Sequence, residues 1–194
     1  MSDTPPTRKG DSPGMRALLV VGVILVVGIL GWLVLIRDDD SGAANGDQAT
    51  VRAGGGPVAA TPADIAKLGR QVGIPAYWAG EQGQAALELT RTSEDKIFVR
   101  YLDAGAEIAD PGDDFLTVAT YPLDGAFELL EQAGDREGAI VEDGPEGSLI
   151  VSNEDSPTSV YMGFPGEEYQ IEIYDPDPER ALNLATSGQI EPAG

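Results

Sequence analysis

The amino-acid sequence predicts an α+β fold: a transmembrane helix near the N-terminus, followed by an antiparallel sheet with about three helices packed on one of its faces. Three observations lead to this prediction. An apolar segment long enough to cross a bilayer occupies residues 17–36. Residues 87–102 and 159–174 each contain two runs of alternating side chains around a polar turn, which is the pattern of a β-hairpin. Capped segments with helical apolar spacing begin near residues 61, 124 and 175.

The apolar segment reads ALLVVGVILVVGILGWLVLI and contains no charged residue. As a helix it spans about 30 Å, the thickness of the hydrocarbon core of a bilayer. Arg8, Lys9 and Arg16 precede it, whereas Arg37 and then three aspartates at 38–40 follow it. Basic residues are retained on the cytoplasmic side of a membrane. The sequence therefore predicts a single-pass protein of the cell membrane, with a cytoplasmic N-terminus and an extracytoplasmic C-terminal domain.

A cleaved signal peptide is the alternative interpretation of this segment. The apolar region of a signal peptide is usually about 7–15 residues long and ends near a small-residue cleavage site. The segment here is longer, and charged residues follow it at once. We therefore expect a signal-anchor that stays in the membrane. It contains no GxxxG pair, so the sequence predicts no oligomeric state.

Composition divides the remainder of the chain. Residues 1–16 are rich in Pro, Ser, Thr and charge, and are expected to form a disordered cytoplasmic tail. Residues 37–60 contain SGAANGDQ and AGGGPVAA without apolar periodicity, and are expected to form a flexible linker. The extracytoplasmic α+β domain is expected to occupy residues 61–190.

The domain is expected to open with a helix after Thr61. Thr61 can cap the first turn, Pro62 suits the first helical position, and Asp64 stands where a capping box places an acid. Gly73 is expected to end this helix. The apolar residues that recur on one of its faces are Ile65, Leu68 and Val72.

Two further helices are expected, with strands between the three. Asp124 is expected to cap the second helix and Gly134 to cap its C-terminus. Asp175 and Pro176 are expected to open the third. The expected strands lie at residues 87–90, 97–102, 115–121, 139–141, 148–151, 159–164 and 169–174.

Alternation in the last strand predicts which side chains face the core. Tyr169, Ile171 and Ile173 share one face, and Gln170 and Glu172 share the other. We expect the three apolar side chains to point toward the core and the two polar ones to point outward.

Two stretches of the sequence resemble each other. Tyr121-Pro122 leads into a helix expected to end at Gly134, and Tyr174-Asp175-Pro176 leads into one expected to end at Gly188. An internal duplication explains the similarity. Chance similarity between two capped helices explains it as well, and both explanations stand at this point.

Composition excludes several functional classes. The 194 residues include 12 Lys plus Arg against 33 Asp plus Glu, a formal net charge of -21, which argues against binding to nucleic acid. The absence of His and Cys excludes metal sites and catalytic nucleophile systems built on those residues. We therefore predict no enzyme and no cofactor. A hydrolase that uses paired carboxylates is the least favoured alternative.

The acidic loop at residues 103–114 is the candidate metal site. It reads DAGAEIADPGDD, and its candidate ligands are Asp110, Asp113 and Asp114. Calcium takes about six to eight oxygen ligands, often from aspartates on a loop. The EF-hand spacing is absent, and a solvated acidic loop is the alternative interpretation.

Tyr77 and Trp78 are the candidate interface residues. They stand outside any regular strand pattern, and Tyr and Trp are common anchors at protein interfaces. Packing of this aromatic pair against the sheet is the alternative interpretation.

Several segments resemble one group of proteins. These are YWAG (77–80), ELTRT (88–92), IFVRYL (97–102) and SVYMGFPG (159–166). With the Ala/Gly/Asp-rich composition and the anchor, the chain resembles uncharacterised single-span envelope proteins of high-GC bacteria. The resemblance implies an envelope location and assigns no site residues. The leading hypothesis is a membrane-anchored extracytoplasmic interaction or accessory domain with an envelope protein partner. The alternative is an envelope domain that binds a small ligand or calcium.

Overall fold

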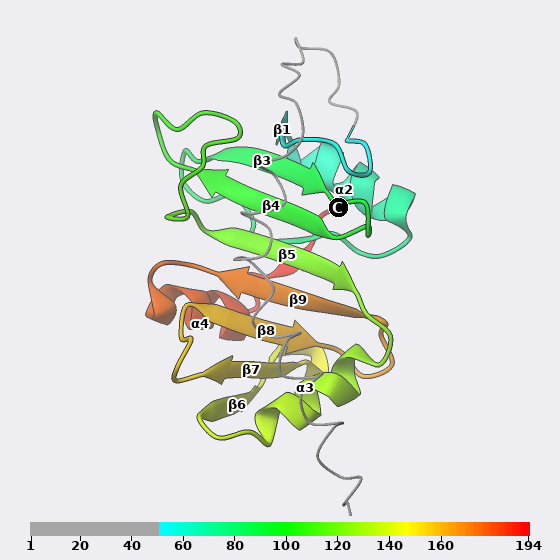
Figure 1. Ribbon diagram of the computed structural model, residues 1–194, viewed down its shortest axis with the longest axis vertical. Coiled ribbons are helices and arrows are strands. Elements are labelled where there is room, and N and C mark those ends of the chain that lie inside the picture. Colours follow the sequence, from blue (N-terminus) through cyan, green and yellow to red (C-terminus); the bar gives the residue numbers. More distant parts are fainter. Residues whose placement is uncertain (1–50) are drawn as a thin grey trace, which may run out of the picture. The chain divides into compact units, whose positions relative to one another are not determined.

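The computed structural model describes residues 51–194, which are coloured by sequence position in Figure 1. The expected tail, the expected transmembrane helix and residues 37–50 of the expected linker lie outside the described residues. Within residues 51–194, no helix combines the length and the apolar character that crossing a bilayer requires.

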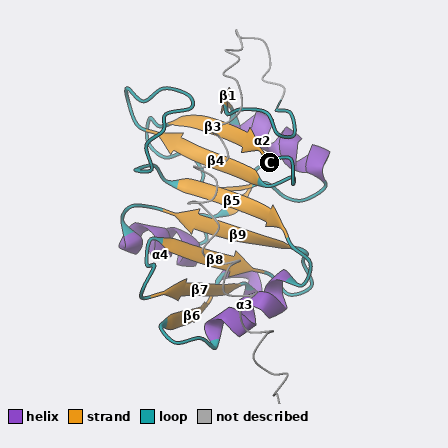
Figure 2. Ribbon diagram, in the orientation of Figure 1, coloured by secondary structure: helices purple, strands orange, loops and turns teal. Residues whose placement is uncertain are grey.

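A single eight-stranded sheet forms most of the described domain, and every neighbouring pair of its strands is antiparallel (Figure 2). The predicted α+β class with an antiparallel sheet is therefore confirmed. From one edge to the other, the strands are β1 (Val58–Ala60), β3 (Ala86–Arg91), β4 (Ile97–Leu102), β5 (Thr117–Pro122), β9 (Tyr169–Tyr174), β8 (Ser159–Gly163), β7 (Leu149–Asn153) and β6 (Ala139–Asp143).

Three α-helices accompany the sheet within the described residues, as the sequence predicts. They are α2 (Pro62–Val72), α3 (Ala126–Gly134) and α4 (Pro178–Thr186), and a short 3-10 turn covers Pro145–Gly147. A second, two-stranded sheet pairs β2 (Tyr77–Trp78) with β10 (Glu191–Pro192), two strands that the sequence analysis did not predict.

The start of α2 confirms the predicted capping box. The Thr61 hydroxyl accepts a hydrogen bond from the Asp64 amide at 3.3 Å, and the Asp64 carboxylate accepts one from the Thr61 amide at 2.9 Å. Pro62 is the first helical residue, and Gly73 ends the helix with a left-handed φ of 86°.

The other two helix starts differ from the prediction. Gly125, with a φ of 66°, precedes α3 in place of Asp124, because the tight turn out of β5 needs a left-handed residue. Asp177 caps α4 in place of Asp175, and its carboxylate accepts a hydrogen bond from the Glu179 amide at 3.0 Å. Asp175 is thereby left for a different role.

Gly134 is the last residue of α3 and does not cap it; Asp135 takes that position. Its lack of a side chain serves packing. A Cβ at residue 134 would stand 2.8 Å from the Val141 side chain, and one at Gly163 would stand 3.3 Å from Leu130. Helix α3 therefore lies very close to β6 and β8.

The helices cover both faces of the sheet, which corrects the expectation that they share one face. Leu130 of α3 packs toward Gly163, whereas Leu184 of α4 and Leu68 of α2 belong to a core on the opposite face. Figure 1 shows α3 in front of the sheet and α2 and α4 behind it. We call the α2/α4 side the apolar face; its strands contribute Leu89, Val99, Val118, Ile173, Val160 and Ile150.

The opposite side, which we call the polar face, is also buried. Gln170 and Glu172 do lie on the side away from Ile171 and Ile173, as predicted, but they are 6% and 1% exposed. The expectation that they point into solvent is therefore wrong, because alternation identifies the two faces of a strand without telling whether the second one is covered. Glu88, Arg100 and Thr117 share this face.

The sheet also begins earlier than composition indicates. Strand β1 lies inside the segment expected to be linker, and it pairs with β3 through Val58 and Leu89. Val51 is 8% exposed and belongs to the core on the apolar face. A three-residue edge strand carries too little alternation to be recognised from sequence.

Gly69 of α2 should not tolerate alanine. In an ordinary helix this change is stabilising by about 1 kcal/mol. Here a Cβ would stand 2.8 Å from the Ala76 amide nitrogen and 3.0 Å from the Ile74 carbonyl oxygen. We expect Gly69→Ala to reduce the free energy of unfolding by about 1–3 kcal/mol. Thermal unfolding of the full chain in detergent checks this. Gly56→Ala, with nothing within 4 Å of the added Cβ, is the control. An unchanged midpoint in Gly69→Ala would contradict the packing described.

Candidate functional site

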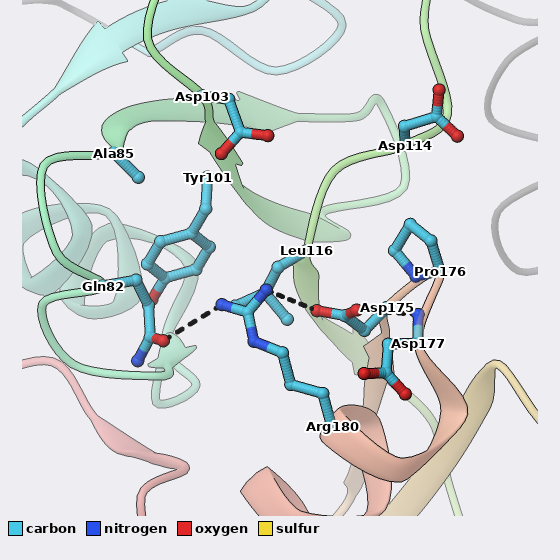
Figure 3. Close-up of a pocket in the computed structure, with 10 residues that line it drawn as sticks. All are labelled: Gln82, Ala85, Tyr101, Asp103, Asp114, Leu116, Asp175, Pro176, Asp177 and Arg180. Atoms are coloured by element: carbon cyan, nitrogen blue, oxygen red, sulfur yellow. Dashed lines mark hydrogen bonds and ion pairs between the residues drawn. The ribbon is translucent and has the colours of Figure 1, made fainter.

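A small pocket lies where β4 and β5 meet the start of α4 (Figure 3). Its volume is about 180 Å³. Four aspartates and one arginine give it a polar lining, while Tyr101 and Leu116 supply part of its wall. The residues that line it are Gln82, Ala85, Tyr101, Asp103, Asp114, Leu116, Asp175, Pro176, Asp177 and Arg180.

Asp175 is the buried acid of this pocket. Its side chain is 4% exposed. One carboxylate oxygen, Oδ1, accepts a hydrogen bond from the Asp177 amide at 2.9 Å. The other, Oδ2, is buried and accepts no hydrogen bond within the described part of the chain. Buried oxygens without a hydrogen bond are rare because they destabilise the folded state, so this oxygen is a candidate for a functional contact.

Arg180 faces Asp175 across the pocket. Its Nη1 stands 3.0 Å from Asp175 Oδ2, which is ion-pair distance, although the orientation of the two groups makes no hydrogen bond. Its Nη2 donates to Gln82 Oε1 at 3.2 Å. The Arg180 side chain is 46% exposed, and Figure 3 shows it reaching across from α4. A half-exposed guanidinium is held weakly, because water competes for it.

Tyr101 forms a fixed wall of the pocket. Its hydroxyl accepts a hydrogen bond from the Ala79 amide at 2.7 Å and donates to the Gly80 carbonyl at 3.2 Å. Burial raises the pKa of the Tyr101 hydroxyl, and the Ala79 hydrogen bond opposes this only in part. The phenol is therefore neutral and both of its hydrogen-bonding roles are occupied.

The predicted metal ligands do not come together around one point. Asp114 lines the pocket. Asp110 makes a local contact within the loop, where its Oδ1 accepts a hydrogen bond from the Gly112 amide at 2.8 Å. Asp113 and Asp114 both lie near Tyr174. The pKa of the Tyr174 hydroxyl is raised first by burial and then by the charges of these two carboxylates. Among residues 51–194, no group of three or more acidic side chains is placed to hold a metal ion.

A buried ion pair holds the acidic loop against the polar face. Arg100 Nη1 donates to Glu88 Oε1 at 2.7 Å, and the two side chains are 4% and 0% exposed. Arg100 Nη2 also donates to the carbonyls of Asp110 and Gly112, at 3.1 and 2.8 Å. Glu88 Oε2 accepts from the Ala109 amide at 2.6 Å. The pair thus fixes the loop that forms one rim of the pocket.

A second buried acid lies at the centre of the polar face. Glu172 accepts hydrogen bonds from the hydroxyls of Tyr121 at 2.5 Å, Ser159 at 2.9 Å and Tyr161 at 3.2 Å. Burial raises the pKa of Glu172, and the three donated hydrogen bonds lower it in part. Burial likewise raises the pKa of both tyrosines. All partners of this carboxylate are internal, which is the arrangement of a structural polar cluster.

The candidate interface residues are buried. Tyr77 is 5% and Trp78 is 9% exposed, and both belong to the core on the apolar face. The Tyr77 amide donates to Thr120 Oγ1 at 3.1 Å, and its ring stacks against Phe164 at a centroid distance of 5.9 Å. These contacts agree with the alternative interpretation, in which the aromatic pair packs against the sheet. An interface at these residues stays a prediction.

Comparison with known proteins places no further constraint on the site: no family model, no curated protein and no solved structure matches this chain.

Sequence reasoning named Asp114 and missed the roles of Asp175, Tyr101 and Arg180. One signal for Asp175 was present. The run Asp175-Pro176-Asp177-Pro178 contains two acids at a helix start, and a helix takes only one N-cap. The acid that does not cap is then available for another contact. No comparable signal marks Tyr101, because its hydroxyl is held by Ala79 and Gly80, which lie before β3, whereas Tyr101 itself lies in β4.

The burial of Glu172 should make stability depend on pH in a direction opposite to that of an ordinary carboxylate. Its pKa is raised above the ordinary value of 4.5. The folded state therefore holds this proton more tightly, and the resulting stabilisation is complete below about pH 4.5 and lost as the pH rises through the raised pKa. Glu172→Gln cannot titrate. Its unfolding midpoint relative to the native chain should rise between about pH 4 and about pH 8.

The control for this measurement is Glu168→Gln, which removes the same charge from an exposed position just before β9. The difference between its unfolding midpoint and that of the native chain should not rise with pH in this way, because Glu168 is exposed in the folded state. A Glu172→Gln difference that stays constant with pH would show that Glu172 does not titrate differently in the folded state.

Proposed function

We propose that this chain is a single-pass protein of the cell membrane whose extracytoplasmic domain binds a positively charged side chain of an envelope protein partner. The bound side chain would enter the pocket beside Asp175. Binding is the function; the proposal assigns no catalytic residue and no cofactor.

Asp175 carries the proposal. A carboxylate that is 4% exposed, with an oxygen that accepts no hydrogen bond among the described residues, is poised to accept one from a donor that enters the pocket. Arg180 already neutralises this charge from an orientation that makes no hydrogen bond. A guanidinium or ammonium group arriving from outside could make the contact that Arg180 does not make.

The size of the pocket supports a side chain as the ligand. Its volume of about 180 Å³ is below the range of about 300–1,000 Å³ that is usual for sites of drug-sized ligands. A single side chain is the group that such a space suits. The aromatic ring of Tyr101 and the apolar side chain of Leu116 could contact the alkyl stem of that side chain.

Charge supports the sign of the ligand. Asp103, Asp114 and Asp177 line the pocket, and all three are exposed. A concave site of one charge sign attracts the opposite sign over distance and speeds association. The formal net charge of -21 for the whole chain acts in the same direction.

The anchor and the envelope location rest on the sequence. The uncharged segment at 17–36 and the basic residues before it support an N-terminus in the cytoplasm. The resemblance to single-span envelope proteins supports the same location. A linker before Val51 would let the domain reach a partner in the same envelope.

We also infer that the domain contains an internal duplication. Strands β3, β4 and β5 form one antiparallel meander, β7, β8 and β9 form another, and β5 pairs with β9 between them. Tyr121 and Tyr174 share the polar face, and a helix follows each of the two strands. The placement of α3 and α4 on opposite faces marks where the two halves differ.

Acetyl-arginine amide should bind to the pocket, and its uncharged citrulline analogue should not. Amide chemical shifts of the full chain in detergent micelles, recorded at low salt, would locate the binding. Asp175→Asn should abolish it while keeping the hydrogen bond to the Asp177 amide. Arg180→Gln should strengthen it about two- to fivefold, because a half-exposed ion pair of about 0.4–1 kcal/mol no longer has to be broken.

Asp155→Asn is the matched control, since it removes the same charge from an exposed turn outside the pocket lining. Its affinity for the arginine probe should equal that of the native chain. Equal shifts with arginine and citrulline, or full binding by Asp175→Asn, would contradict the proposal. Calcium that shifts the same amides when arginine does not would favour the calcium-binding alternative.

A further inference from the structure

Strand β6 forms an open edge of the sheet and exposes apolar side chains. It pairs with β7 on one side and ends the strand order on the other. Ile140 is 42% and Val141 is 48% exposed, and only Ile108 joins them as an exposed large hydrophobic residue within residues 51–194. Open apolar edges attract further strands, and proteins usually protect them. The opposite edge, β1, is three residues long.

The pairing with β7 determines which backbone groups of β6 point outward. The Gly144 amide donates to the Ser148 carbonyl at 2.7 Å, and the Glu154 amide donates to the Gly138 carbonyl at 2.9 Å. In an antiparallel pair, alternate residues make these bonds. Ile140 and Glu142 therefore bond toward β7. The residues whose backbone groups face the open side are Ala139, Val141 and Asp143.

An antiparallel partner strand must pair with these outward residues, which restricts a second copy to a few registers. If Val141 opposes Asp143, Glu142 stands directly opposite Glu142 of the other copy. If Val141 opposes Ala139, Asp143 stands opposite Glu137. Both registers place like charges opposite each other, which is destabilising.

The remaining register places Val141 opposite Val141. Ile140 then opposes Glu142, and Asp143 opposes Ala139, so no two acids are directly opposed. The two Glu142 residues lie on a diagonal, about 7–8 Å apart. The Val141 amide and carbonyl bond reciprocally with those of the second copy, and each Asp143 amide meets an Ala139 carbonyl. The Ala139 amide is already used, because it donates to the Arg136 carbonyl at 3.1 Å.

We infer that β6 is a homodimerisation strand, which pairs with β6 of a second copy across a two-fold axis at Val141. Such an interface is isologous, because the same surface serves both copies. It joins two sheets into one and covers Val141 and Ile140. The inference is independent of the pocket at Asp175, to which β6 contributes no residue.

Cysteine crosslinking in intact membranes tests both the contact and its register. The chain has no Cys, so each introduced thiol is the only one present. Paired residues of a hydrogen-bonded antiparallel site have Cα atoms about 5.5 Å apart, within the range of about 4.4–6.8 Å that a disulfide accepts. Full-length Val141→Cys should form a disulfide-linked dimer under mild oxidation. Asp143→Cys and Ala139→Cys should each stay single when expressed alone and should crosslink when coexpressed.

Asp155→Cys, exposed and outside β6, gives the level of random collision. Dimer from Val141→Cys at no more than that level would overturn the inference. So would a dominant crosslink through Glu142→Cys or Ile140→Cys, which belong to the other registers. A disulfide from Val141→Cys to a different polypeptide would overturn the second copy as occupant.

Sedimentation of the full chain without cysteines supplies a second measurement. The native chain in detergent should have the protein mass of a dimer. Val141→Arg, which places like charges on the two-fold axis at an exposed position, should have the mass of a monomer with an unchanged circular dichroism spectrum. Equal protein masses for the two would overturn the inference.

Discussion

The pairing of β5 with β9 is the interaction on which the rest of the domain depends. Strands β3, β4 and β5 form one meander, β6, β7, β8 and β9 form another, and β5–β9 is the ladder that joins them. It brings together Tyr121 and Glu172, which are 51 residues apart. It also aligns Val118 with Ile173 in the apolar core. A non-local ladder costs loop-closure entropy before it contributes stability, so both of its faces must be well packed.

Each face of that ladder is stabilised differently. On the apolar face, large aliphatic side chains pack under α2 and α4, and removal of their surface from water supplies the driving force. On the polar face, Glu88 and Glu172 are both buried, and each has its hydrogen bonds supplied from within the domain. Breaking a buried ion pair by removing one partner costs about 3–5 kcal/mol, and leaving either of these acids without partners should cost a similar amount. The polar groups therefore restrict which arrangement of strands is tolerated.

Local sequence patterns predict the helices and hairpins, whereas the burial of the polar face and the pocket depend on tertiary contacts. Two-residue alternation located the hairpins at Leu87–Leu102 and Ser159–Tyr174 because it is a property of neighbouring residues. Thr61 and Asp64 identified the start of α2 for the same reason. Alternation could not tell that the face of Glu172 is covered, because α3 and the acidic loop arrive from elsewhere in the chain. The pocket likewise forms from segments that are far apart in the sequence. Asp114, Tyr101 and Asp175 come from three segments, and only Asp114 is among the site residues that the sequence predicts.

The pairing of Arg180 with Asp175 has a consequence for how the domain would meet a partner. In the proposed binding, an incoming guanidinium would take the place of one that is already present, so capture would be an exchange of counterions within the pocket. The net free energy of such an exchange would be the gain of a hydrogen bond to Asp175 Oδ2 minus the loss of the ion pair with Arg180, so attachment would be weaker than to a carboxylate without a counterion. Two proteins held in one membrane meet at a high effective concentration, and weak contacts then suffice. If the domain is anchored and binds as proposed, its internal counterion would suit it to repeated, brief contacts with neighbouring proteins along the membrane surface.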